Sequence, residues 1–261
     1  MVFGCESIMN DFRSSADSGK LGHSYLFFGD KGVGKRMFAA SLANFLETGD
    51  FRFGDKNKTL IDSRFFIPDE KGIISIDVAR EIKKFLSERP FVSSKKTAII
   101  DDSHCLTSEA QSSLLKVVEE PPAHALIVFI AGSAEVLFPP LLSRLSKIYF
   151  PRMPSPELEK ILTEQFGIHK KTAHNAAIRS FGRIGEALRV LQVENADDPD
   201  RQNKTENLTQ WIENEILRLR TENLRGSSGR ILRLIRKETE CGRFNLNPSL
   251  QKKAIADIIS K

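Results

Sequence analysis

The sequence predicts an α/β fold in which a five-stranded parallel sheet is followed by an all-helical part. Short apolar runs alternate with stretches of helical spacing, which is typical of a parallel sheet covered by helices on both faces. A glycine-rich loop of the phosphate-binding kind directly follows the first apolar run. After Pro151, Pro154 and Pro156 the pattern becomes helical throughout, so these prolines mark a boundary.

The five predicted strands are the uninterrupted apolar runs Tyr25–Phe28, Arg64–Ile67, Thr97–Ile100, Ala125–Ala131 and Lys147–Phe150. Between them, apolar residues recur at helical spacing in Gly34–Leu46, Asp77–Glu88 and Ser108–Val118. Beyond the prolines, the predicted helices are Ser155–Phe166, Lys170–Phe181 and Ile184–Val193. Ser155 and Pro156, followed by Glu157, form a favourable helix start.

The chain is expected to divide into three parts. Residues 1–151 form the predicted nucleotide-fold domain, 152–195 a three-helix lid and 204–261 a short helical domain. The polar segment Asn195–Asn203 separates the last two as a linker.

Composition describes a globular protein, because 40% of its 261 residues are hydrophobic and 28% are charged. Residues 1–150 carry 19 basic and 19 acidic side chains, so the net charge of +5 belongs to the second half. No apolar run approaches the roughly 18–20 residues of a membrane-spanning helix, and the first residues lack a signal-peptide pattern. We therefore expect a cytoplasmic protein with no membrane partner.

Metal ligation by cysteine or histidine is not expected. Cys5, Cys105 and Cys241 form no CxxC pair, and the five histidines form no HxxxH or HExxH spacing. This argues against zinc and against a disulfide framework.

The sharpest motif is a phosphate-binding loop, which matches G-x-x-x-x-G-K-[ST] in seven of eight positions. Its glycines would let backbone N–H groups cradle phosphate oxygens, and its lysine would reach the β- and γ-phosphates. The eighth position holds an arginine where a Ser or Thr hydroxyl would bind Mg²⁺. A glycine-rich turn that binds nothing is the alternative. The predicted nucleotide-binding residues are Gly29, Asp30, Lys31, Gly32, Val33, Gly34, Lys35 and Arg36.

A second motif is the apolar strand Thr97–Ile100, which ends in Asp101 and Asp102. This is the Walker B pattern, in which Asp101 would hold Mg²⁺ through water and the next acid would orient the attacking water. Asp102 is one methylene shorter than the usual glutamate, so its reach is in question, and hydrolysis depends on positioning. Solvated acids at a strand end are the alternative.

Several segments together resemble the AAA+ subunits of bacterial clamp loaders, over about Met1–Leu191. The first is HSYLFFG leading into GVGK, and the most specific is LLKVVEEPP, which resembles the family's NALLKTLEEPP. Ser143-Arg144-Leu145 resembles its Ser-Arg-Cys motif, with leucine in place of cysteine. The resemblance implies an AAA+ P-loop domain, a helical lid and a small collar domain, which would be short here.

Within that family the chain is more similar to the delta-prime subunit of DNA polymerase III than to the gamma/tau motor. Arg36 replaces the motor's Thr or Ser, and Asp102 replaces its glutamate. Gly185 stands where the motor's sensor-2 motif has arginine, with Arg183 nearby on another helix face. These three losses indicate a stator, with weak or absent ATPase activity of its own within the DNA polymerase III holoenzyme. Delta-prime and motor subunits often carry a four-cysteine zinc module, but Glu47–Ile73 contains no cysteine, so the module is absent or has lost its metal.

The retained Arg144 implies an arginine finger that acts in trans on a neighbouring subunit's ATP, although a salt bridge at a helix end is the alternative. Ser133 matches sensor 1, or is a plain turn residue. The resemblance further implies ATP and Mg²⁺ as ligands, gamma/tau and delta subunits as partners, and the sliding clamp and primed DNA as targets of the complex.

Two other functions remain open from the sequence. The chain could be an active AAA+ ATPase, in which Asp102 suffices and water replaces the hydroxyl ligand. It could also be a purely structural interaction module with a vestigial P-loop. The basic residues between Arg218 and Lys237 fit DNA phosphate contact or a solvated or subunit-facing helix surface.

Overall fold

The computed structural model describes residues 3–52, 60–194, 212, 215–216 and 232–234. At its centre lies a sheet of five strands in the order β2-β3-β4-β1-β5, and every pairing in it is parallel. The strands are β1 (Ser24–Phe28), β2 (Ser63–Phe66), β3 (Lys96–Ile100), β4 (Ala125–Ala131) and β5 (Ser146–Tyr149). The predicted five-stranded parallel sheet is confirmed, with bounds that shift by at most one residue.

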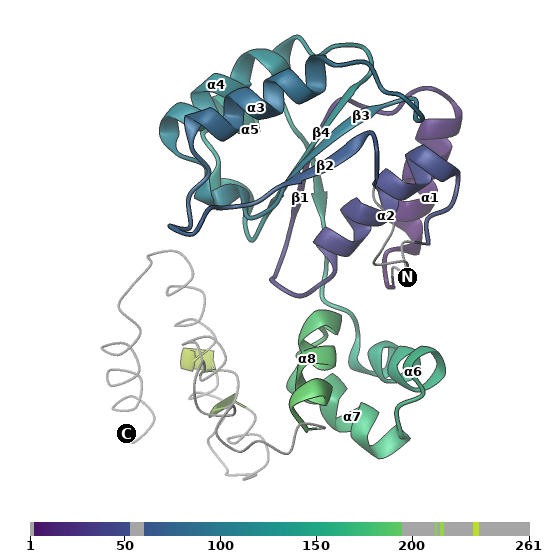
Figure 1. Cartoon of the computed structure of the whole chain (residues 1–261). Helices are drawn as coiled ribbons and strands as arrows, with labels where there is room; N and C mark the ends of the chain where they lie inside the picture. Colours follow the sequence, from purple (N-terminus) through teal and green to yellow (C-terminus); the bar gives the residue numbers. More distant parts are fainter. Residues whose placement is uncertain (1–2, 53–59, 195–211, 213–214, 217–231, 235–261) are drawn as a thin grey trace.

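Helices cover both faces of the sheet (Figure 1). One face carries α1 (Glu6–Asp17) and α2 (Lys35–Thr48), and the other carries α3 (Ile76–Ser87), α4 (Ser108–Glu119) and the short α5 (Pro139–Leu142). Two 3₁₀ turns, η1 (Ser103–Cys105) and η2 (Ala134–Val136), follow β3 and β4. The helix α1 was not predicted. Its Phe12 packs edge-on against Phe27 and Phe38, with ring centroids 5.7 and 5.6 Å away.

Three helices follow the sheet: α6 (Ser155–Phe166), α7 (Lys170–Arg179) and α8 (Ile184–Glu194). They share a separate apolar core, whose buried members include Leu158, Leu162, Ala173, Ala177 and Leu191. The helix α7 ends two residues earlier than predicted. Phe181 and Gly182 adopt left-handed backbone conformations, with φ of 51° and 77°, which an α-helix cannot continue through.

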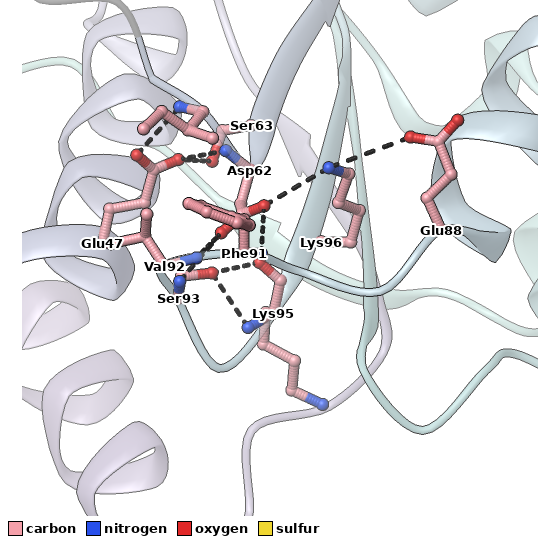
Figure 2. Close-up of polar contacts among 10 residues, drawn as sticks. Glu47, Asp62, Ser63, Glu88, Phe91, Val92, Ser93, Lys95 and Lys96 are labelled. Atoms are coloured by element: carbon pink, nitrogen blue, oxygen red, sulfur yellow. Dashed lines mark hydrogen bonds and ion pairs between the residues drawn. The ribbon is translucent and has the colours of Figure 1, made fainter.

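The connection from α3 to β3 is built around one buried carboxylate, that of Asp62 (Figure 2). It accepts backbone N–H groups from Phe91 (2.7 Å), Val92 (2.6 Å) and Ser93 (2.8 Å), and it lies 3.3 Å from the Lys96 ammonium. Burial alone would raise the pKa of Asp62, but these four donors outweigh it and hold the pKa below its usual range. The loop so fixed leaves the Phe91 residue 86% exposed.

A second carboxylate, that of Glu47 at the end of α2, fastens the start of β2 to this arrangement (Figure 2). It accepts the N–H groups of Ile61 (3.0 Å) and Asp62 (2.9 Å) and the hydroxyl of Ser63 (3.0 Å). The edge strand is thereby tied to α2 through polar contacts as well as through its apolar side chains.

The helical domain expected at 204–261 lies almost entirely outside the described residues, as do Cys241 and most of the basic residues between Arg218 and Lys237. Among the residues that are described, no helix combines the length and the apolar character needed to span a membrane.

Candidate nucleotide site

The predicted phosphate-binding loop connects β1 to α2 and has the backbone that such a loop needs. Gly29, Gly32 and Gly34 have φ of 137°, 87° and 104°, which side-chain-bearing residues rarely adopt. At Gly29 a Cβ atom would also overlap the carbonyl oxygen of Phe150. Gly34 caps the N-terminus of α2, so the helix begins at Lys35 with its unpaired N–H groups at the loop. The sequence places glycine where this geometry requires it.

The side chain of Lys35 folds back onto its own loop. Its ammonium donates to the carbonyl oxygens of Gly29 (2.6 Å) and Asp30 (2.7 Å), and the residue is 7% exposed. Burial lowers the pKa of Lys35 to about 8, although the carboxylates of Asp30, Asp101 and Asp102 act in the opposite direction. A phosphate group would offer this ammonium a stronger acceptor than the two carbonyls.

Arg36 is paired with the predicted Walker B aspartate. Its NH1 lies 2.8 Å from Oδ2 of Asp101, and its guanidinium carbon lies 5.2 Å from the centre of the Phe65 ring. The other carboxylate oxygen of Asp101 accepts the backbone N–H of Asp102 at 3.1 Å. The structure thus joins Arg36 and Asp101, which are 65 residues apart, although sequence reasoning treated them as separate features.

Asp102 has a left-handed backbone, with φ of 48°, at the turn between β3 and η1. Its side chain is 55% exposed and lies 3.9 Å from Nδ1 of His104. Ser133 caps η2, where its hydroxyl bonds the Glu135 carboxylate and accepts the Glu135 N–H. The predicted roles of Asp102 in hydrolysis and of Ser133 as sensor 1 stay predictions.

Arg144 follows α5, on the face of the sheet opposite α2 (Figure 1). Its NH2 forms a 2.6 Å ion pair with Glu119, the last residue of α4 and part of the LLKVVEEPP segment. Its NH1 donates to the carbonyl oxygen of Pro140 at 2.5 Å and contacts the Ser143 hydroxyl at 3.2 Å. These partners are all outside the phosphate-binding loop, so Arg144 is not part of the group formed by Lys35, Arg36 and Asp101.

Sequence reasoning missed two contacts that join the loop to the helical part. The carbonyl oxygen of Gly32 accepts the backbone N–H of Gly185 at 2.8 Å, and Arg152 forms a 2.5 Å ion pair with Asp30. A Cβ atom at residue 185 would come within 3.1 Å of the Gly32 oxygen. Gly185, which stands where the motor's sensor-2 motif has arginine, is therefore also a position where two backbone segments approach closely.

A cavity of about 220 Å³ opens beside the loop, between the N-terminal segment and the start of the helical part. Its wall includes Phe3, Cys5, Val33, Met153 and Ile184. Burial raises the pKa of the Cys5 thiol to about 11, and Glu6 and Glu157 add to the shift. This thiol is therefore neutral at ordinary pH, and the charged residues Arg152 and Glu157 also line the cavity.

The residues around the loop do not fit a protein-held magnesium ion. Mg²⁺ needs oxygen ligands in near-octahedral geometry, whereas a guanidinium has donors only. In the part of the chain that the structure describes, no group of three or more His, Cys, Asp or Glu side chains is arranged to hold a metal.

The sheet order, the phosphate-binding loop between β1 and α2, and the helices behind it define an AAA+ fold. Solved structures share this fold. A DNA polymerase III gamma subunit-related protein of Thermotoga maritima superposes with a TM-score of 0.51 and 19% identity, over 95% of this chain and 97% of that one. RuvB of Thermotoga maritima, a Holliday junction branch migration motor, superposes with a TM-score of 0.52 and 19% identity, over 74% of this chain and 65% of that one.

The particular family follows from sequence similarity. Residues 4–154 match the family described as "DNA polymerase III, delta subunit", and the chain belongs to it. Replication factor C subunit 3 of Saccharomyces cerevisiae is 32% identical over 209 residues, covering 76% of this chain and 58% of that protein. DNA polymerase III subunit gamma/tau of Mycobacterium tuberculosis is 27% identical over 181 residues. That alignment covers 64% of this chain and only 31% of the mycobacterial protein.

Proposed function

We propose that the chain is a delta-prime-like subunit of the DNA polymerase III clamp loader. In this proposal it binds nucleotide through Gly29–Arg36 with little turnover and presents Arg144 to the nucleotide of a neighbouring ATPase subunit. Its partners are loader subunits of the gamma/tau and delta kinds, and the complex places the sliding clamp on primed DNA in the cytoplasm.

The observation that carries the proposal is the ion pair between Arg36 and Asp101. It replaces the hydroxyl of an active P-loop with a cation, and it engages the carboxylate that would otherwise hold the metal's water. Phosphoryl transfer depends on metal and water being positioned together. A site with this pair is suited to hold a nucleotide and poorly suited to hydrolyse it.

Nucleotide binding is supported by the loop and by the cavity beside it. The positive φ angles of Gly29, Gly32 and Gly34 give the loop the backbone of a phosphate cradle at the N-terminus of α2. The cavity next to Val33, at about 220 Å³, is smaller than sites for drug-sized ligands, which measure roughly 300–1,000 Å³. It is suited to the base of a nucleotide whose phosphates lie in the loop.

A role in trans for Arg144 is supported by where its guanidinium lies. The side chain is 39% exposed, and Glu119, with which it pairs, is 43% exposed. Exposed ion pairs contribute about 0–1 kcal/mol, so a phosphate from another subunit can replace Glu119 at little cost. Arginine fingers generally raise the rate of phosphoryl transfer by about 10³–10⁵-fold.

The test is ATP hydrolysis by a loader reconstituted with gamma/tau- and delta-type subunits, with Arg144→Ala as the variant. We expect the complex to assemble and its hydrolysis rate to fall by at least about tenfold. Arg80→Ala is the matched control, because Arg80 is also exposed and paired with a carboxylate, that of Asp77 at 2.7 Å. An unchanged rate for Arg144→Ala refutes the arginine-finger role.

The same preparations separate the two other functions. Magnesium-dependent turnover by the isolated chain, lost in Lys35→Ala, would make it an active ATPase. Stable assembly without nucleotide binding would make it a structural module.

A further inference from the structure

The guanidinium of Arg36 is fixed against Asp101, the residue that follows β3. It belongs to the first residue after Lys35, at the start of α2. The Asp101 carboxylate holds it from one side at 2.8 Å, and the Phe65 ring lies 5.2 Å away as a cation–π partner. The side chain is nevertheless 61% exposed. A fixed positive charge with unused N–H donors is therefore accessible next to Asp101, near the start of α2.

Asp101 is already satisfied by this arrangement. Its side chain is 11% exposed, one oxygen accepts from Arg36 and the other accepts the backbone N–H of Asp102. A divalent ion bound by this carboxylate would have to displace the guanidinium or lie against a like charge within a few ångströms, where repulsion is strong. The geometry therefore disfavours a metal ion at Asp101, where the Arg36 guanidinium supplies a positive charge instead.

Guanidinium groups are well suited to bind phosphate. Their planar N–H donors match phosphate oxygens in pairs, and they stay charged at any ordinary pH. Lys35 would bind phosphate as the lysine of any loop of this kind does, and Arg36 adds one further positive charge beside Asp101, the residue that would otherwise hold the metal's water.

We propose that Arg36 takes the place of magnesium in this loop, so that the site binds a nucleoside triphosphate equally well with and without a divalent metal. The inference rests on the proposed nucleotide binding and deepens it, because it names the form of the ligand that the site accepts. It also distinguishes this loop from one that only lacks the Ser or Thr hydroxyl. In such a loop the affinity for the nucleotide would still depend on a metal ion held by other ligands.

The test is calorimetric titration of the full chain with ATP, once with excess MgCl₂ and once with excess EDTA. We expect the two Kd values to agree within about threefold, a difference below about 0.7 kcal/mol. Arg36→Thr restores the hydroxyl and frees Asp101, so its affinity should become at least about tenfold stronger with magnesium than with EDTA. Arg36→Lys is the matched control, because it keeps a charge and offers no metal ligand, and it should stay indifferent to magnesium.

Each outcome decides a different point. Binding of ATP to the unsubstituted chain only in magnesium overturns the inference and leaves nucleotide binding intact. An Arg36→Thr variant that remains indifferent to magnesium also overturns it. Absence of binding in both buffers overturns nucleotide binding and the inference together, while the role of Arg144 is tested separately by the reconstituted loader. The ratio of Kd values within one preparation does not depend on the fraction of folded protein.

Discussion

Asp62 accepts three backbone N–H groups of the loop between α3 and β3, so Asp62→Ala should release that loop. The substitution removes the acceptor of three backbone N–H groups and the counter-ion of Lys96, whose side chain is 9% exposed (Figure 2). The variant therefore leaves these N–H groups without their acceptor, and the Lys96 ammonium keeps the Glu88 carboxylate, 4.0 Å away, and the Phe85 ring as its partners.

The magnitude can be worked from these contacts. A hydrogen bond to a charged group contributes about 1.5–3 kcal/mol, and removal of one partner of a buried ion pair costs about 3–5 kcal/mol. These values are not additive, because the four donors share one carboxylate and water can enter once it is gone. We expect the free energy of unfolding to fall by about 3–5 kcal/mol for Asp62→Ala.

Amide hydrogen exchange is the direct assay, since it reports on the three loop N–H groups individually. Protection at Phe91, Val92 and Ser93 should fall by about 10²–10⁴-fold, which corresponds to the expected free energy. Asp69→Ala is the control, because Asp69 also accepts backbone N–H groups (from Lys71 and Ile73) but is exposed, and its cost should stay below about 1 kcal/mol. Equal effects of the two substitutions would refute the reasoning from burial.

The difference in unfolding free energy between the unsubstituted chain and Asp62→Ala should also depend on pH. The folded pKa of Asp62 is lowered, so its contribution is fully present above the unfolded value of about 3.9. It is lost as the pH falls through the folded pKa, and the gap between the two proteins should close below about pH 4.

Three other predictions follow from single contacts. The pKa of Lys35 is lowered to about 8 in the folded chain, so between about pH 8 and 10.5 only the unfolded chain holds the proton. The unfolding free energy of the unsubstituted chain relative to Lys35→Met should therefore rise over this range. A difference between the two proteins that does not change with pH in urea unfolding would contradict this. Gly185→Ala should cost about 1–3 kcal/mol because its Cβ meets backbone atoms of Gly32 at 3.1 and 3.2 Å, whereas Gly132→Ala, with no heavy atom within 4 Å of its Cβ, should be nearly neutral in the same thermal scans. Glu119→Gln should change the unfolding free energy by less than about 1 kcal/mol, since both it and Arg144 are partly exposed; a larger loss would make the pair structural.

The sheet could be predicted because its central strands are buried on both faces. All residues of β3 and β4 are buried, which requires the continuous apolar runs visible in the sequence. The bounds differ by one residue where polar side chains such as Ser24 and Lys96 continue the pairing. The helix α1 could not be predicted from apolar spacing, because only Phe12 of its twelve residues is buried.

The candidate site was predictable only where it is contiguous. The glycine spacing of the loop follows from local backbone conformation, which the sequence encodes directly. The pairing of Arg36 with Asp101 depends on the packing of α2 beside β3, and a short-range pattern contains no such information. Asp62 gave no signal at all, because an isolated aspartate before a strand is indistinguishable from a solvated one until its burial is known.

The two contacts between the phosphate-binding loop and the helical part differ in how they respond to salt. The bond from Gly185 to Gly32 joins uncharged peptide groups, so ionic strength hardly affects it. The ion pair of Arg152 with Asp30 is more than one-third exposed on both sides, and dissolved ions screen it. Raising the salt concentration should therefore weaken the ionic contact and leave the peptide hydrogen bond, together with the ring contact of Phe3 with Phe166, to hold the helices in place.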